Sequence, residues 1–300
     1  MRMKILLLGK GGQVGMALQS ALLPLGELVA LGRAELHLEN LTDVARQLAH
    51  HRPDIIVNAA AYTAVDKAES DTATAFLINA TVVGVLSDWA KQNSSLLVHY
   101  STDYVFDGTK QSPYIETDQV NPQNVYGASK RAGEEAILQS GCNALIFRTS
   151  WVFSSTGNNF IKTILKLAKS HDSIRVVSDQ HGTPTSAEYI ADITALAITA
   201  YRNHSLPNGL YHLTATGTTS WFDFACYIVE RALSHGITLK LTPEHILPIS
   251  TDKYPLPARR PKNSTLDISA LSNILALQMA DWRIYVDQTI EKIAQQMVIA

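Results

Sequence analysis

The sequence predicts an α/β protein: a Rossmann-type doubly wound parallel sheet with a smaller mixed substrate-binding lobe towards the C-terminus. Short, mainly apolar runs without polar alternation occur at residues 4–8, 54–57 and 144–147. Runs without polar alternation are typical of parallel strands covered on both faces. Segments with helical spacing of apolar residues, such as 66–92, lie between them. This alternation of strand and helix over the first half favours a doubly wound sheet.

The first strand, residues 4–8, runs directly into a glycine-rich turn with the spacing G-x-x-G-x-x-G. At a strand-to-helix junction, Gly9 permits the tight turn, Gly12 lets backbone N–H groups approach a pyrophosphate, and Gly15 allows close helix packing. An empty glycine-rich turn is the alternative interpretation. The dinucleotide contacts predicted in this turn are Gly9, Gly12, Gln13, Val14 and Gly15.

The second strand, 27–31, ends in Gly32-Arg33, with no acidic residue at the position that often holds the ribose 2′-hydroxyl of NAD. Arg33 could pair with a 2′-phosphate instead, so the sequence favours NADPH and leaves NADH possible. A solvated surface arginine is the alternative. Asn40, ahead of a helical pattern, is either an adenine contact or a helix-entry residue, and Leu41 belongs to the same predicted cofactor set.

The strand at 54–57 leads into Asn58 and three alanines. Small side chains at the carboxyl end of a strand leave room for a ligand in the crevice where open α/β sheets bind their ligands, although a tight helix–strand contact would also explain them. The predicted cofactor contacts here are Ala61, Tyr62 and Thr63. Residues 95–100 return to strand and end at the hydroxyl groups of Ser101 and Thr102.

Tyr126 and Lys130 are four residues apart, which places them on one face of a helix. A nearby ammonium group lowers the pKa of a phenol, and the Thr102 hydroxyl could hold a carbonyl oxygen against it. The pair alone would also fit a solvated aromatic and cation. We predict a catalytic group of Thr102, Tyr126 and Lys130, the last two also contacting the cofactor. Asn121-Pro122 is expected to start this helix.

Beyond residue 153 the alternation loosens. Helical patterns remain at 158–169, 186–201, 220–234 and 279–297, separated by loops rich in glycine and proline. We expect residues 1–153 to form the dinucleotide-binding Rossmann domain and 154–300 mainly the substrate-binding lobe. Segments within 174–213, notably 174–178 and 209–213, are expected to return to the main sheet as strands.

The balance of 25 Lys and Arg against 27 Asp and Glu gives a net charge of −2, which offers no match to nucleic acid or an anionic membrane. The two cysteines, Cys142 and Cys226, fit reduced thiols rather than a disulfide framework. The apolar N-terminal run is too short for a signal peptide, and no stretch of about 18 uninterrupted apolar residues occurs. We therefore expect a cytoplasmic protein whose partner is a small molecule.

Five motifs in this order resemble the extended short-chain dehydrogenase/reductases that act on nucleotide sugars, and among them most closely the dTDP-4-dehydrorhamnose reductase family. The resemblance covers almost the whole chain. Its motifs are the glycine-rich turn 9–15, Asn58-Ala-Ala-Ala61, Ser101-Thr-Asp-Tyr-Val-Phe106, Tyr126-x-x-x-Lys130 and Asp179-Gln-x-Gly-x-Pro-Thr185.

The resemblance implies NADPH-dependent reduction of the C4 ketone of dTDP-4-dehydro-6-deoxy-L-mannose to dTDP-L-rhamnose, a precursor of lipopolysaccharide O-antigen. Tyr126 would donate the proton, and Lys130 would lower its pKa and bind the nicotinamide ribose. The implied substrate contacts are Thr102, Asp103, Trp151 and Arg260. Arg259 is an equal candidate for the diphosphate on chemistry alone, and a solvated basic pair is the alternative for both.

Tyr104 separates this chain from related dehydratases, which resemble it at the strand tip but follow the threonine with an Asp-Glu pair. The resemblance therefore favours a reductase over a dehydratase or an epimerase. A reductase that yields another epimer, such as dTDP-6-deoxy-talose, and a non-catalytic NADP-binding regulatory subunit remain alternatives.

Some members of the resembled family bind Mg²⁺ at a dimer contact through glutamates, one of which follows the glycine-rich turn. This chain has Ala17 there and keeps Glu188. One carboxylate is a poor site for a hard divalent cation. We therefore expect no metal site, doubt a role for Mg²⁺, and expect a monomer or weak homodimer.

Overall fold

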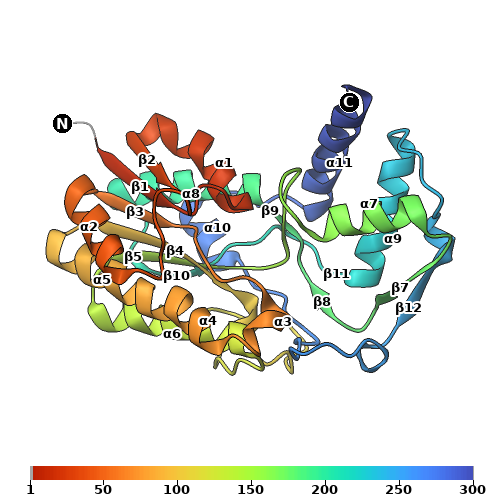
Figure 1. The fold of residues 1–300 in the computed structure, drawn as a ribbon, viewed down its shortest axis with the longest axis horizontal. Helices are drawn as coiled ribbons and strands as arrows, with labels where there is room; N and C mark the ends of the chain where they lie inside the picture. Colours follow the sequence, from red (N-terminus) through yellow and green to blue (C-terminus); the bar gives the residue numbers. More distant parts are fainter. Residues whose placement is uncertain (1–2, 300) are drawn as a thin grey trace.

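The computed structural model describes residues 3–299 and confirms the doubly wound α/β fold (Figure 1). Six strands, all parallel to their neighbours, form the main sheet in the order β10-β5-β4-β3-β1-β2. Their carboxyl ends meet at one edge, where such sheets bind ligands. The strands are β1 (Lys4–Leu8), β2 (Glu27–Leu31), β3 (Ile55–Asn58), β4 (Leu96–Thr102), β5 (Asn143–Thr149) and β10 (Gly209–His212).

Helices cover both faces of the sheet, which explains the continuous apolar runs. In β1, Ile5 and Leu7 belong to one hydrophobic cluster, whereas Leu6 and Leu8 belong to a second cluster on the opposite face. Successive side chains of a strand point to opposite faces, so a strand buried twice must be apolar throughout. One face carries α1 (Gln13–Leu22) and α8 (Ala187–Arg202), and the other carries α2 (Leu41–His51), α5 (Val82–Asn93) and α6 (Val125–Ser140) (Figure 1).

The helical pattern at 66–92 is divided into α3 (Val65–Ala68), α4 (Thr72–Phe76), a π-helical turn (Leu77–Thr81) and α5. By length and composition alone, the helix from Thr72 to Asn93 could cross a membrane. Its apolar residues Val82, Val83 and Leu86 are fully buried within the second cluster, together with strand residues of the sheet. Packing on the sheet therefore accounts for the hydropathy of this helix.

The lobe holds the remaining long helices at bounds close to those predicted: α7 (Phe160–Ser170), α9 (Trp221–Ser234) and α11 (Trp282–Ile299). Short strand pairs connect them, together with the short helix α10 (Ser269–Leu275). These pairs are β6 (Val152–Phe153) with β9 (Thr185–Ser186), β8 (His181–Gly182) with β11 (Thr219–Ser220), and β7 (Ile174–Val177) with β12 (Ile246–Ile249).

Of the two segments expected to return to the main sheet, 209–213 does so as β10, which pairs with β5. The expectation for 174–178 is wrong, because β7 pairs with β12 inside the lobe. Arg175 is exposed between buried neighbours in β7, the pattern of a strand covered on one side only. Such a strand does not suit a sheet that is covered on both faces.

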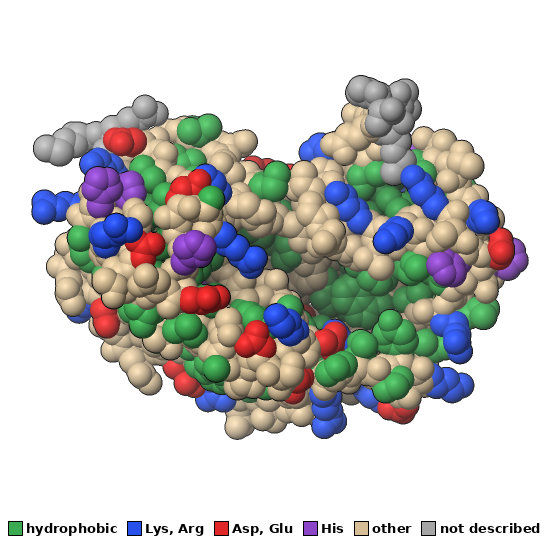
Figure 2. Space-filling model, in the orientation of Figure 1, with side chains coloured by type: hydrophobic (Ala, Val, Ile, Leu, Met, Phe, Trp, Pro, Cys, Tyr) green, Lys and Arg blue, Asp and Glu red, His purple; other side chains and the backbone are tan. Residues whose placement is uncertain are grey.

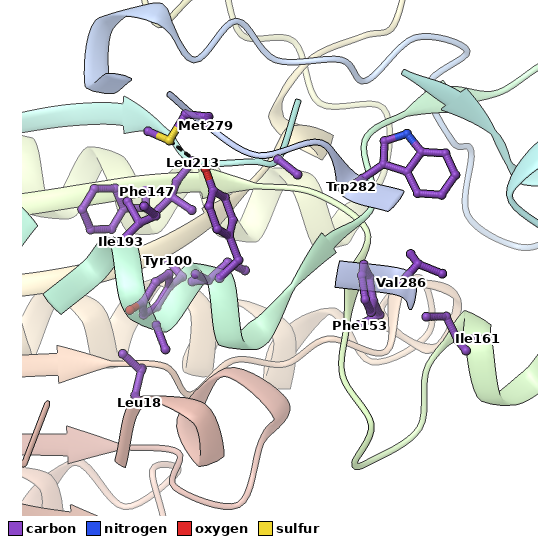
Figure 3. Close-up of a cluster of buried hydrophobic side chains, with 14 of the residues drawn as sticks. Leu18, Tyr100, Phe147, Phe153, Ile161, Ile193, Leu213, Met279, Trp282 and Val286 are labelled. Carbon is purple, nitrogen blue, oxygen red and sulfur yellow. Dashed lines mark hydrogen bonds between the residues drawn. The ribbon is translucent and has the colours of Figure 1, made fainter. Parts of the chain in front are cut away.

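A single hydrophobic cluster joins the sheet to the lobe (Figure 3). Leu18 of α1, Tyr100 of β4 and Phe147 of β5 belong to it, as do Phe153 and Trp282 of the lobe. Because the two parts share this core, the lobe is held against the carboxyl edge of the sheet. Figure 2 shows a hollow between the two halves of this face, with hydrophobic side chains at its bottom.

Candidate active site

The glycine-rich turn packs directly on the end of β3. Gly9 has φ +85°, in the left-handed region that favours glycine, and a Cβ there would lie 2.7 Å from the Ala60 nitrogen. A Cβ at Gly15 would lie 2.0 Å from the Gly9 carbonyl oxygen. No larger side chain fits at either position without moving the backbone, so both glycines are needed for the close packing of this turn.

The N-terminus of α1 has no side-chain cap, unlike those of α2, α6, α7, α8 and α9. Its first backbone N–H groups therefore remain available, which suits an anion at the positive end of the helix dipole. Gln13 accepts a hydrogen bond of 2.8 Å from Asn159, bringing the loop before α7 to this turn. Asn40 caps α2 by accepting from the Asp43 N–H group, as its helix-entry interpretation expects.

An acidic side chain does lie at the end of β2, contrary to the expectation from the sequence. Arg33 is exposed as expected, but Glu35 turns back towards the strand end. Its carboxylate accepts from the Gly32 N–H group at 2.8 Å and pairs with Lys10 of the glycine-rich turn at 2.7 Å. These bonds lower the pKa of Glu35 and hold an anion beside the predicted 2′-phosphate contact. The sequence interpretation overlooked it because Glu35 lies four residues beyond the strand end.

The segment of Ala61, Tyr62 and Thr63 follows β3 and is held in place by Asn79 of the π turn. Asn79 accepts from the Tyr62 N–H group at 2.9 Å and donates to the Tyr62 carbonyl at 3.0 Å. It also donates to Ser129 of α6 at 2.9 Å. Asn79 thus ties the predicted cofactor segment to the helix of Tyr126. The only sequence signal for it is one amide within an apolar helical pattern.

The helix that carries Tyr126 begins later than predicted. Asn124, rather than Asn121, is the N-cap, and its side chain accepts from the Gly127 N–H group at 2.7 Å. Asn121 instead donates its N–H to the Val105 carbonyl at 2.8 Å, which fixes the segment 121–124 as a loop against the strand tip. The later start places Tyr126 in the first turn of α6.

Gly127 brings α6 close to the end of β4. A Cβ at this position would lie 2.2 Å from the Tyr104 carbonyl oxygen, so the two backbones can approach only because Gly127 has no side chain. The Tyr126 hydroxyl consequently forms a hydrogen bond with Thr102. Burial raises the pKa of Tyr126 to about 12, and this hydrogen bond opposes the rise. Tyr126 is therefore held as a neutral phenol with a proton to give.

Lys130 is buried behind this pair, with 2% of its surface exposed. Its ammonium donates to the Tyr100 carbonyl at 2.5 Å and lies 3.2 Å from the His99 Nε2 atom. Burial lowers the pKa of Lys130 to about 8, opposed by the charge of Glu134. His99 is fully buried, and its Nδ1 atom lies 3.2 Å from the Asn58 amide. Sequence analysis missed His99 as a partner of the lysine.

Trp151 lies beside this group because Thr149, two residues earlier, pairs with Thr102 across β4 and β5. It has φ +47°, uncommon for a bulky residue and a strain that tends to persist at functional sites. Its ring stacks on Trp221, with centroids 3.4 Å apart and planes at 6°. A Cβ at Gly182 would lie 2.5 Å from the Trp151 ring, so Gly182 is needed for this orientation.

Arg260 reaches the site from the C-terminal part of the chain. Its guanidinium forms two hydrogen bonds, of 3.0 and 2.7 Å, with the Asp66 carboxylate, and it also bonds to the Tyr104 side chain. The Tyr104 ring lies 6.0 Å from that of Tyr126 in an edge-to-face arrangement. Arg259, an equal candidate on sequence grounds, is exposed. The structure therefore brings Arg260 to the site.

Glu188, the remaining glutamate that the resemblance links to Mg²⁺, is hydrogen-bonded to another side chain of this chain. Glu188 accepts a hydrogen bond of 2.9 Å from the Ser154 hydroxyl. Within residues 3–299 no group of three or more His, Cys, Asp or Glu side chains could hold a metal ion.

The fold and the site together define a Rossmann-fold oxidoreductase of the short-chain dehydrogenase/reductase class. A family model described as the RmlD substrate binding domain matches residues 3–295. The chain is 47% identical over 298 residues to the dTDP-4-dehydrorhamnose reductase of Burkholderia thailandensis, covering 98% of this chain and 100% of that protein. It is also 47% identical over 298 residues to the Escherichia coli K12 enzyme of that name, covering 97% and 98%.

A crystal structure of dTDP-4-dehydrorhamnose reductase from Bacillus anthracis in complex with NADP superposes with a TM-score of 0.87 at 34% identity. The superposition covers 97% of this chain and all of that one. The chain belongs to the dTDP-4-dehydrorhamnose reductase family, which confirms the family resemblance and makes it an oxidoreductase.

Proposed function

We propose that this enzyme uses NADPH to reduce the C4 ketone of dTDP-4-dehydro-6-deoxy-L-mannose, giving dTDP-L-rhamnose. The observation that carries the proposal is the hydrogen bond of Tyr126 with buried Thr102 at the carboxyl edge of the sheet, with buried Lys130 behind it. The names of the relatives supply the sugar, since two of them with that name are 47% identical to this chain.

In this proposal Tyr126 is the general acid and Thr102 orients the substrate oxygen. NADPH, when bound, supplies the hydride for C4. The phenol, kept neutral by burial, can then give its proton to the alkoxide oxygen that forms. Lys130 would hold the nicotinamide ribose, because a buried ammonium with one carbonyl and one imidazole partner retains a further N–H to donate.

The cofactor contacts are proposed on the geometry of the first two strand ends. The uncapped start of α1 and the turn that includes Gly9 and Gly15 suit the pyrophosphate. Exposed Arg33 suits a 2′-phosphate, as does Lys10 when freed from Glu35. The NADP in the Bacillus anthracis structure supports this choice, and NADH remains usable in the proposal.

The sugar contacts are proposed on the other side of the site. Trp151 would cover the sugar ring, and Arg260, oriented by Asp66, would pair with the diphosphate through its planar fork of donors. Tyr104 stands where a dehydratase has a glutamate. Burial raises the pKa of the Tyr104 phenol above its usual value. It therefore cannot act as a base, and elimination of water is not supported.

The proposal is tested by supplying the purified protein with NADPH and dTDP-4-dehydro-6-deoxy-L-mannose and following absorbance at the nicotinamide band. We expect NADPH oxidation that depends on the sugar, and NMR of the product should show the rhamnose configuration. A 6-deoxy-talose product would establish the alternative stereochemistry. Failure to oxidise NADPH, together with tight binding of another protein, would favour the regulatory subunit.

A further inference from the structure

Asp103 is a buried carboxyl group that lacks a full set of partners. It begins the short 3₁₀ helix after β4 and is 2% exposed. Its Oδ1 atom accepts a hydrogen bond of 2.9 Å from the Thr102 hydroxyl, whereas its Oδ2 atom is buried with no partner. Among the ion pairs of residues 3–299, none involves Asp103. A buried carboxylate without a cation favours its protonated form.

The state of Asp103 decides where the Thr102 proton points. A hydroxyl has one proton, and the Thr102 oxygen already accepts from the Tyr104 N–H group at 3.2 Å. While Thr102 donates to an ionised Asp103, it has no proton for Tyr126 or for a substrate oxygen. A protonated Asp103 donates to Thr102 instead, and the Thr102 proton is then directed into the site.

Asp103 can exchange its proton near neutral pH. Burial raises its pKa to about 7, opposed by the hydrogen bond from Thr102. The titratable groups that face it are Tyr104 of the 3₁₀ helix and Tyr126 of α6, both with pKa values raised by burial. The Tyr104 side chain is in turn hydrogen-bonded to the Arg260 guanidinium. Asp103 is thus the member of this group that loses its proton most easily.

The proton source on the opposite side of Tyr126 is the Lys130 ammonium, whose pKa burial lowers to about 8, so it holds its proton more firmly than Asp103 does. Lys130 contacts the Tyr100 carbonyl, which has no proton, and His99. Burial and the charge of Lys130 lower the pKa of His99 well below its usual value, so this imidazole is not a reservoir of protons at neutral pH.

We propose that Asp103 stores the proton that refills Tyr126, through the Thr102 hydroxyl, after each reduction. When the Tyr126 O–H bond breaks, its proton goes to the alkoxide oxygen of the product. The phenolate takes the Thr102 proton, and Thr102 takes the proton of Asp103, which is left as a carboxylate. Water restores that proton when the product leaves. Asp103 is therefore a positioning residue that acts through Thr102, and this role rests on the proposed reduction.

The test is Asp103→Asn, which keeps the shape and can still donate an N–H to Thr102 but cannot pass on a proton. We expect a first turnover close to the wild-type rate, then steady-state turnover slowed by about 10- to 100-fold, within the range of a lost proton-transfer group. Stopped-flow absorbance should show a burst of one NADPH per site. The wild-type kcat should fall as pH rises through about 7, because the proton store empties. This fall should be absent in the variant.

The exposed Asp172→Asn is the matched control and should leave the kinetics unchanged. A raised KM with the pH-dependent fall retained would overturn the relay and leave Asp103 as a sugar contact. If Asp103→Asn fails to fold, infrared spectra of the wild type decide instead: no carboxylic-acid band that disappears as pH rises through about 7 would overturn the proposal. Wild-type protein that does not oxidise NADPH would contradict the proposed function itself, and not the relay alone.

Discussion

The side of the site that we propose donates the proton, around Thr102, Tyr126 and Lys130, is built differently from the side that we propose faces the sugar, around Arg260 and Trp151. The first lies on the end of one strand and the first turns of one helix, and Lys130 is 2% exposed. The second depends on a contact between Asp66 and Arg260, which are 194 residues apart in sequence. Local buried structure thus positions the proposed catalytic residues, whereas a contact between distant segments positions the proposed substrate contacts.

Each side has one bidentate carboxylate–guanidinium pair, and their burial differs. Glu134 of α6 and Arg148 of β5 form two bonds of 2.8 and 2.7 Å, and their side chains are 4% and 5% exposed. In the Asp66–Arg260 pair the side chains are 36% and 18% exposed. Removing one partner of a buried pair leaves an uncompensated charge, whereas water screens a half-exposed pair. We therefore expect the first pair to determine stability and the second to determine substrate affinity.

The largest effect is expected from Tyr126→Phe, which removes only the phenolic proton. Turnover should fall by about 10²- to 10⁴-fold, the usual range for a general acid. NADPH affinity, measured by fluorescence titration, should stay the same, because the ring and the helix remain. Tyr254→Phe, at a 52% exposed tyrosine, is the control. A variant that keeps its rate would show that another group donates the proton.

The difference between the two sides also explains what the sequence could predict. The glycine-rich turn, Thr102 and the Tyr126–Lys130 pair could be predicted as a site because each is a local pattern at a strand end or helix start. The bridge from Asp66 to Arg260 was not, since no local pattern records which residues meet across 194 positions. The start of α6 was misplaced because Asn121 and Asn124 are equally good caps, and only the Val105 contact of Asn121 decides between them.

The second largest effect is expected from Glu134→Gln, which breaks the buried pair. The free energy of unfolding should fall by about 3–5 kcal/mol, because Arg148 would keep a buried charge without its carboxylate partner. The Nη1 atom of Arg148 lacks a hydrogen-bond partner even in the wild type. Glu135→Gln removes the neighbouring exposed pair with Arg131 and should cost less than about 1 kcal/mol. Urea denaturation compares the two variants. Equal losses would contradict the assignment of stability to the buried pair.

A smaller effect, on affinity, is expected from Asp66→Asn. Arg260 would keep its charge but lose its orientation, so KM for the nucleotide sugar should rise about tenfold, equivalent to about 1.4 kcal/mol. Stability should change by less than about 1 kcal/mol, since the pair is partly exposed. Arg259→Ala is the control and should leave KM unchanged, because that side chain is exposed. An equal rise in KM for NADPH would show that Asp66 supports the whole site and not the sugar side alone.

The smallest effect is expected at the end of β2, where the proposed contacts of the cofactor phosphate are exposed. Arg33→Ala should raise KM for NADPH by about threefold to tenfold, with little change for NADH, because an exposed ion pair contributes about 1 kcal/mol. Glu35→Gln should lower KM for NADPH, since it releases Lys10 and removes an anion beside the phosphate. Both effects should shrink at high salt, which screens exposed charges. Parallel changes for NADPH and NADH would mean that Arg33 binds a part common to both cofactors, and selectivity would then have to come from elsewhere on this side of the sheet.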